Sequence, residues 1–168
     1  MNIQIRPETP ADTTAIDAVT VAAFANAEHS SHTEQFIVAA LRRSGQLTVS
    51  LVAEQSGAIV GHVAISPVTI ADADIDWYGL GPVSVVPPLQ NRGIGTQLIE
   101  EALNQLRALG AAGCVVLGEP AYYARFGFEA TAALTLPGVP AEYFQALSFG
   151  TDAPQGTVAY HASFSATE

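Results

Sequence analysis

The chain has 168 residues, of which 49% are hydrophobic and 13% charged, a composition that suits a single domain over residues 1–168 with a sizeable core. Its formal net charge is -10 and all six basic residues are arginine. We expect no nucleic-acid partner, because an acidic surface repels phosphate backbones. The charge serves solubility first and attracts a cationic substrate only weakly.

Three further features of the sequence bear on location. No apolar run approaches the roughly 20 residues of a membrane span, and residues 1–6 lack the apolar core of a signal peptide. The one cysteine, Cys114, lies in an apolar run, where it builds no disulfide framework and where burial raises a thiol pKa. These features predict a cytoplasmic protein without a membrane partner.

A strand and two helices are predicted in the first part of the chain. Residues 3–6 alternate and predict a strand. Thr9 and Pro10 predict a helix start, with Thr9 as N-cap, and the apolar face of this helix runs to Phe24. Residues 34–43 carry apolar side chains at helical spacing and predict a second helix.

Three strands are expected next. Residues 47–54 and 58–67 are rich in strand-forming side chains, and the Gln55-Ser56-Gly57 sequence between them is typical of a hairpin turn. Residues 76–86 predict a third strand, interrupted by Gly79, Gly81 and Pro82. Glycine and proline inside a strand indicate a bulge or a close approach of another backbone.

The second half of the chain contains the clearest helix, over residues 94–109, where apolar side chains recur at helical spacing. Residues 114–117 predict a strand buried on both faces, and residues 120–126 predict a short helix with a proline near its start. Strand-like pieces follow around Leu134 and over residues 158–164. The elements together predict a mixed α/β fold.

The turn Gln90-Asn91-Arg92-Gly93-Ile94-Gly95 lies between the interrupted strand and the clearest helix. This order is typical of a phosphate site, because the first N–H groups of a helix lack internal partners and the helix dipole favours an anion. A helix packed closely on a strand would leave the same pattern. A Walker A loop is excluded because the chain has no lysine, and the dinucleotide fingerprint is incomplete because Leu98 stands at its third glycine position.

The same turn resembles the acyl-CoA pyrophosphate loop of the GNAT superfamily, the acyl-CoA-dependent N-acyltransferases. The usual pattern of that loop is Gln/Arg-x-x-Gly-x-Gly/Ala after a strand ending in Val-x-Pro, and here the strand ends Val85-Val86-Pro87. The family's Tyr-x-x-x-Gly-Phe signature is matched by Tyr123-Ala124-Arg125-Phe126-Gly127-Phe128. Residues 61–68, 77–83 and 117–123 are similar to its small YhbS-like bacterial branch, so the resemblance covers nearly the whole chain.

The resemblance implies a fold and a reaction. The fold is a central mixed, mostly antiparallel sheet flanked by helices, whose fourth and fifth strands, residues 77–86 and 114–117, splay apart at a bulge to admit the pantetheine arm. The reaction is transfer of an acetyl group from acetyl-CoA, the co-substrate, to a primary amine by direct attack in a ternary complex, without a metal. The acceptor is a small molecule or a protein amine.

The resemblance also implies which residues hold the donor. The pyrophosphate would lie on main-chain N–H groups of the glycine turn, and the pantetheine amides would pair with the main chain of the splayed fourth strand. Members of the family often dimerise, which leaves a homodimer open. The residues expected to bind acetyl-CoA are Val83, Ser84, Val85, Gln90, Asn91, Arg92, Gly93, Ile94, Gly95 and Thr96.

Two side chains are expected to carry the chemistry. By resemblance, Tyr123 is the acid that protonates the leaving thiolate, and an unperturbed phenol pKa of about 10 keeps it protonated at neutral pH. A packed aromatic ring is the alternative, which suits the neighbouring Tyr122 better. Glu119, at the end of the fifth strand, is the candidate base, but capping of the helix that Pro120 opens is the role that the sequence favours.

Other routes for the proton remain open. His62 lies on a central strand, where a histidine is more often a hydrogen-bonded core residue than a base. Asp76, Glu34 or a water relay would also serve. Residues 28–34 contain His29 and His32, but the stretch lacks the His-Glu-x-x-His order of a zinc site, so a polar loop is expected there.

Two rival functions follow from the same residues. One is a catalytically silent acyl-CoA-binding sensor or regulatory module, which would hold the donor and transfer nothing. The other is transfer of a longer acyl group from an acyl carrier protein. An acidic surface disfavours that second rival, because it would repel an acidic carrier.

Overall fold

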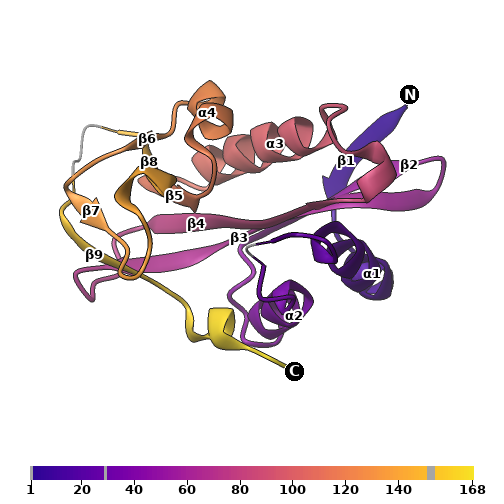
Figure 1. The fold of residues 1–168 in the computed structure, drawn as a ribbon, viewed down its shortest axis with the longest axis horizontal. Coiled ribbons are helices and arrows are strands. Elements are labelled where there is room, and N and C mark those ends of the chain that lie inside the picture. Colours follow the sequence, from indigo (N-terminus) through magenta and orange to yellow (C-terminus); the bar gives the residue numbers. More distant parts are fainter. Residues whose placement is uncertain (1, 29, 151–153) are drawn as a thin grey trace.

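The computed structural model describes residues 2–28, 30–150 and 154–168. Within these ranges nine strands form a sheet in the order β1-β2-β3-β4-β5-β8-β6, with β9 on the far end of β3 and β7 beside β9 (Figure 1). The strands are β1 (Ile3–Pro7), β2 (Val49–Gln55), β3 (Ala58–Ile70), β4 (Trp77–Val85), β5 (Gly113–Leu117), β6 (Glu129–Ala130), β7 (Leu134–Thr135), β8 (Phe144–Ser148) and β9 (Gly156–Tyr160). The helices are α1 (Thr13–Phe24), α2 (Glu34–Arg43), α3 (Ile94–Ala108) and α4 (Pro120–Tyr123).

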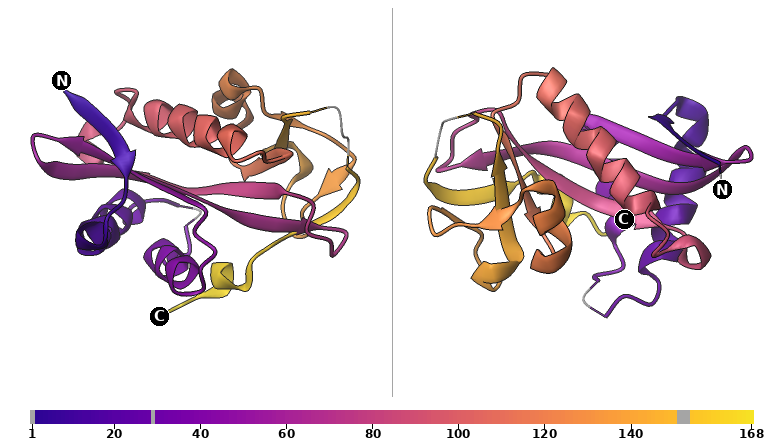
Figure 2. Two further views of the ribbon diagram at one scale, coloured as in Figure 1. Left: turned by 180° about the vertical axis from the view of Figure 1, so that it is seen from behind. Right: turned by 90° about the horizontal axis from the view of Figure 1, so that it is seen from above.

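Helices cover both faces of the sheet. α3 and α4 lie on one face, and α1, α2 and the C-terminal turn lie on the other, as both views in Figure 2 show. α3 buries the apolar stripe that its sequence predicts, including Leu98 and Leu106, against Val63 and Ile65 of β3. None of the helices in the described ranges is long and apolar enough to cross a membrane.

The fourth and fifth strands splay apart halfway along β4. β4 pairs with β5 in parallel only from Trp77, opposite Gly113, to Leu80, opposite Val116. Gly81 then adopts a φ of +132°, and the register of β3 against β4 shifts between Val63 and Ile65. The rest of β4 pairs with β3 alone. The mixed, mostly antiparallel sheet with splayed fourth and fifth strands is therefore confirmed.

Three details differ from the sequence-based elements. The first helix opens with a 3₁₀ turn over Pro10–Asp12, in which the Asp12 carboxylate accepts from the Thr9 N–H at 2.7 Å. The strand predicted over residues 158–164 is wrong beyond Tyr160, because the chain turns at Ala162–Ser165, where the Ser163 N–H donates to the His161 ring at 3.1 Å. The pattern also failed to predict β8, which pairs with β5 along its whole length.

Candidate active site

A cavity of about 490 Å³ lies at the N-terminus of α3, between that helix, the splayed part of β4 and α4. Its walls bring together residues from both sequence motifs. The residues that line the cavity are Val83, Val85, Leu89, Gln90, Asn91, Gly93, Ile94, Gly95, Thr96, Tyr122 and Arg125. Eight of the ten residues that the sequence assigned to donor binding thus line one cavity.

Backbone conformation explains the residue types in the glycine turn. Asn91 and Gly93 have φ values of +64° and +87°, a left-handed region that glycine enters without strain and asparagine enters more readily than most other residues. The helical ladder begins with the Gln97 N–H donating to the Gly93 carbonyl at 3.0 Å, so the N–H groups before Gln97 are free to face an anion. The Gln90 amide donates to the Val85 carbonyl at 2.9 Å and ties the turn to the end of β4.

Tyr122 and Arg125 complete this wall, and neither was assigned to donor binding from the sequence. The Tyr122 hydroxyl lies 2.9 Å from Thr96 Oγ1, in the first turn of α3. The Arg125 guanidinium lies over the Tyr122 ring, 4.4 Å from its centroid, and donates through Nε to the Tyr122 carbonyl at 3.0 Å. Arg125 is one of six cations in an acidic chain and belongs to the Tyr-x-x-x-Gly-Phe motif, a signal that could have identified it.

The two remaining donor candidates do not line the cavity. Arg92 is exposed on the turn. Ser84 is buried, with 1% of its surface exposed, and alternates with Val83 and Val85, so its side chain points through the sheet toward α1. Any contact of Ser84 with a donor would therefore go through its main chain.

Tyr123 packs beside the cavity at the end of β5. Its ring lies against the backbone of Gly118, where a Cβ atom would overlap it, and meets the Tyr122 and Phe128 rings edge-on. Burial, with a smaller contribution from Tyr122, raises the pKa of Tyr123 to about 12. The phenol therefore stays protonated throughout the neutral range.

Glu119 stands at the junction of β5 and α4, and its side chain is exposed. Its carbonyl accepts from the N–H groups of Tyr122 and Tyr123, each at 3.1 Å. The side chain makes no hydrogen bond to the first turn of α4, so the helix-cap alternative is not supported.

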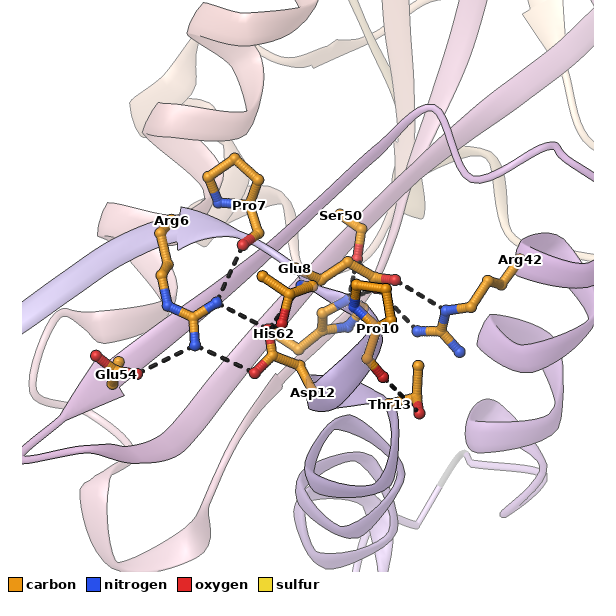
Figure 3. Close-up of polar contacts among 11 residues, drawn as sticks. Arg6, Pro7, Glu8, Pro10, Asp12, Thr13, Arg42, Ser50, Glu54 and His62 are labelled. Carbon is orange, nitrogen blue, oxygen red and sulfur yellow. Dashed lines mark hydrogen bonds and ion pairs between the residues drawn. The ribbon is translucent and has the colours of Figure 1, made fainter.

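His62 lies in the core, with none of its surface exposed, on the face of the sheet that α1 covers. Its Nε2 is 2.8 Å from Ser50 Oγ, which donates to the Glu8 carboxylate, and Arg42 donates to the same carboxylate through Nε and an Nη atom (Figure 3). Burial is the main reason that the pKa of His62 falls to about 4, with Glu8 opposing and Arg42 reinforcing the shift. The imidazole is therefore neutral at pH 7.

The remaining polar candidates lie elsewhere. Asp76 precedes β4 at the end of the paired segment that is farther from the splay. The Glu34 carboxylate accepts from Ser30 Oγ at 2.7 and 2.8 Å. His29 lies outside the described residues, and in the remainder of the chain no three histidine, cysteine or carboxylate side chains gather as a metal site would require.

Comparisons with known proteins show which family the chain resembles. A family model for the acetyltransferase (GNAT) domain matches residues 46–130. The uncharacterized N-acetyltransferase YhbS of Escherichia coli (strain K12) is 38% identical over 168 residues, with 95% of this chain and 97% of the relative covered.

Two solved structures are similar over nearly the whole chain. A GNAT family acetyltransferase from Brucella melitensis, in complex with acetyl-CoA, is 52% identical with a TM-score of 0.88, covering 97% of this chain and 98% of that one. Escherichia coli YhbS in complex with CoA is 36% identical with a TM-score of 0.89, covering 98% of this chain and 93% of that one. With its fold, its motifs and its full-length relatives in agreement, the chain belongs to the GNAT family of acetyltransferases.

Proposed function

We propose that this acetyltransferase binds acetyl-CoA in the cavity at the N-terminus of α3 and transfers the acetyl group to a primary amine. The observation that carries the proposal is the continuity of that cavity with the splayed part of β4. The two similar structures hold acetyl-CoA and CoA, which supports the same donor here. The acceptor is an amine of a small molecule or a protein.

The pyrophosphate is assigned to the free N–H groups of Ile94, Gly95 and Thr96, where the helix dipole adds to the attraction. Arg125 and Arg92 supply the nearby positive charge. A Cβ atom on Gly95 would lie 3.7 Å from the Tyr122 hydroxyl and 3.8 Å from Val85, so glycine keeps this corner of the cavity open. Pantetheine would add to the free edge of β4 like a strand, pairing with the main chain of Val83, Ser84 and Val85.

The reaction follows from the chemistry of a thioester and an amine. The amine nitrogen attacks the carbonyl carbon, and a main-chain N–H at the β4 bulge stabilises the oxyanion. The C–S bond then breaks, and Tyr123 gives its proton to the leaving thiolate. The amine loses a proton to Glu119 or to water. The acceptor approaches from the face of α1 and α2, because α3, the glycine turn and α4 occupy the other face.

Thermal unfolding with and without acetyl-CoA tests the donor first. A ligand at a hundred times its dissociation constant stabilises the folded state by roughly 2.7 kcal/mol, a readily measured shift. Gly93→Glu should abolish the shift, because it places a charged side chain at a left-handed position beside the pyrophosphate site. Gly110→Glu, at a left-handed position after the other end of α3, is the matched control and should keep it. No shift at millimolar acetyl-CoA would overturn the donor assignment.

Thiol release from acetyl-CoA tests the transfer. The protein is incubated with acetyl-CoA and, in turn, phenethylamine, putrescine, lysine amide and alanine amide, and free CoA is measured with a thiol reagent. Amine-dependent release supports the proposal and begins to define the acceptor. Binding of acetyl-CoA without release from any amine or any lysine-bearing protein would favour the sensor over the enzyme.

A further inference from the structure

Leu117 is the last residue of β5 and the first residue beyond the segment that pairs with β4, which ends where Leu80 lies opposite Val116. Val116 packs in the cluster under α3, whereas Val115 packs in a cluster on the other face of the sheet. Because side chains alternate along a strand, Leu117 points to the face of Val115, away from α3. It therefore stands at the opening between β4 and β5, on the same face as α1 and α2.

The Leu117 side chain is uncovered, although it belongs to a central strand. It has 45% of its surface exposed, whereas residues 113–116 of the same strand are all buried. Phe144 lies opposite it on β8 and is 3% exposed, so the apolar surface continues from Leu117 into the core. A single exposed leucine needs no explanation on an outer surface, but this one lies where the two splayed strands part.

The donor proposed above would bring its reactive end to the same opening. With the pyrophosphate at the N-terminus of α3, pantetheine runs along the free edge of β4, past Val85 and Val83, toward Gly81. The strands part at Gly81, so the thioester carbonyl is expected between Gly81 and Leu117. An amine that attacks from the face of α1 and α2 must then pass the Leu117 side chain.

Tyr160 of β9 lies on this same face, at the other side of the opening. It pairs with Val68 of β3, and its ring reaches Gly79 of β4, with Cε1 closer to that glycine than Cδ1. A Cβ atom at position 79 would overlap the ring, so glycine lets the hydroxyl end of the ring approach β4. Gly79 pairs with Val115 and stands two residues before Gly81. The phenol thus ends beside the last paired residues before the splay.

The Tyr160 hydroxyl makes no hydrogen bond to a described residue. Burial is the main reason that the pKa of Tyr160 lies above its usual value, and electrostatic interaction with Cys114 and Tyr123 adds to the shift. The phenol is therefore protonated at pH 7 and lies within electrostatic reach of Tyr123, the proposed acid. Phe164 packs on the ring, with the centroids 4.8 Å apart. Because a buried phenol usually has a partner, this hydroxyl is available to a ligand.

We propose that Leu117 and Tyr160 bind the acceptor, and that the acceptor is a primary amine carried by an alkyl or arylalkyl group. The apolar group packs on Leu117, and the amine nitrogen donates a hydrogen bond to the Tyr160 hydroxyl. The proposal rests on the transfer function proposed above and narrows its acceptor. The reaction keeps its balance: the N–C bond forms, the C–S bond breaks, the nitrogen loses a proton to Glu119 or water, and the thiolate gains one from Tyr123.

Contact with Leu117 selects for carbon. A second ammonium group on the acceptor would lose water against an apolar side chain and gain no partner from it, which costs free energy. A fully buried methylene contributes about 4-fold in affinity, so a methylene that is half covered by Leu117 contributes about 2-fold. The predicted order is therefore hexylamine before butylamine before ethylamine, with putrescine and lysine amide below hexylamine.

Thiol release with this series tests the acceptor class at a fixed pH of about 8. The monoalkylamines have similar pKa values, so the same fraction of each is deprotonated. The value of kcat/KM should rise roughly 10- to 20-fold from ethylamine to hexylamine. Equal values along the series, or a preference for putrescine or lysine amide, would overturn this proposal and leave the transfer function intact. No release with any amine would overturn the transfer function, and the acceptor class with it.

Two variants assign the effect to the two side chains, and neither empties the core. Leu117→Ser should reduce the gradient from ethylamine to hexylamine to less than about 3-fold. Leu109→Ser is the matched control, because Leu109 is also an exposed leucine, with 62% of its surface exposed, but lies at the far end of α3. It should keep the full gradient. A gradient that persists in Leu117→Ser would overturn the role of Leu117.

Tyr160→Phe keeps the ring over Gly79 and against Phe164, and removes only the hydroxyl. The KM for every amine should rise roughly 3- to 10-fold, as expected for one lost hydrogen bond, while the KM for acetyl-CoA stays unchanged. A purely structural role of the hydroxyl would move both constants together or neither. Either of those two results would remove Tyr160 from acceptor binding.

Discussion

The phenol of Tyr122 lies 2.9 Å from the hydroxyl of Thr96 and joins α4 to the first turn of α3. Tyr122 belongs to the short helix after β5, and Thr96 belongs to the helix that the glycine turn begins, so the contact joins the segments that follow the two splayed strands. Arg125 lies over the same ring and places a cation on this wall. The two sequence motifs thus form one site.

Replacing Tyr122 with Phe removes that contact and keeps the ring. We expect the free energy of unfolding to fall by about 1 kcal/mol, the usual net value of one hydrogen bond. The affinity for acetyl-CoA should fall several-fold, because the first turn of α3 loses its support. Calorimetric titration measures the affinity. Tyr143→Phe, at a ring that is 39% exposed, is the control, and an equal loss in both variants would contradict a specific role for Tyr122.

Replacing Arg125 with Gln tests the electrostatic part of donor binding. The dissociation constant for CoA should rise about 10-fold, since a charge-assisted contact to phosphate contributes roughly 1.5–3 kcal/mol and this one is partly screened. The effect should shrink as salt is added. Arg43→Gln, on α2 across the sheet, removes the same charge and should leave the affinity unchanged. Salt-independent weakening would indicate lost packing on Tyr122 instead of lost charge.

Replacing Tyr123 with Phe separates binding from chemistry. The ring should still pack against Gly118 and Phe128, so acetyl-CoA binding should stay near normal. Turnover should fall at least about 10-fold, because the leaving thiolate loses its proton donor. Steady-state thiol release and calorimetric titration measure the two quantities on the same sample. Unchanged turnover would remove Tyr123 from the mechanism.

The sequence predicted most of this architecture because its strongest patterns act locally. The apolar stripe of α3, the glycine turn and the interruptions of β4 each depend on residues that are close together in the sequence. β8 was missed because its five residues, Phe144–Ser148, gain their stability from pairing with β5, a contact far along the chain. Arg125 was missed although it lies inside the Tyr-x-x-x-Gly-Phe motif, because its position beside the glycine turn becomes visible only in the folded chain.

The hydrogen-bonded residues buried around His62 could not be predicted from the sequence for the same reason, because they are far apart along the chain. Nothing within residues 58–67 distinguishes a core histidine from a functional one. Its properties come from its burial and from Glu8, Arg42 and Ser50, which lie in three other parts of the chain (Figure 3). Sequence reasoning named His62 as a core residue, and the structure agrees that it is buried but leaves its Nδ1 without a partner among the described residues.

The lowered pKa of His62 predicts how stability depends on pH. Its pKa is about 4 in the folded protein against 6.5 in the unfolded chain, mainly because of burial. Above pH 6.5 neither state binds the proton and the full stability is present. As the pH falls from 6.5 toward 4 the unfolded chain binds it more readily, so the free energy of unfolding should drop by roughly 3 kcal/mol. Urea unfolding across this range measures the drop.

His62→Gln identifies the source of that slope. The variant is less stable at pH 7, where it loses the fit of the imidazole, but it has no group that titrates between pH 6.5 and 4 at this position. Its stability should therefore change little over that interval. Glu8 and Asp12 also have lowered pKa values, because hydrogen bonds from Arg42 and Ser50 to Glu8, and from Arg6 and the Thr9 N–H to Asp12, outweigh burial. Their contributions are lost only as the pH falls below their ordinary pKa values of 4.5 and 3.8, so most of the slope above pH 4.5 belongs to His62. An unchanged slope in His62→Gln would show that a group other than the buried imidazole takes up the proton.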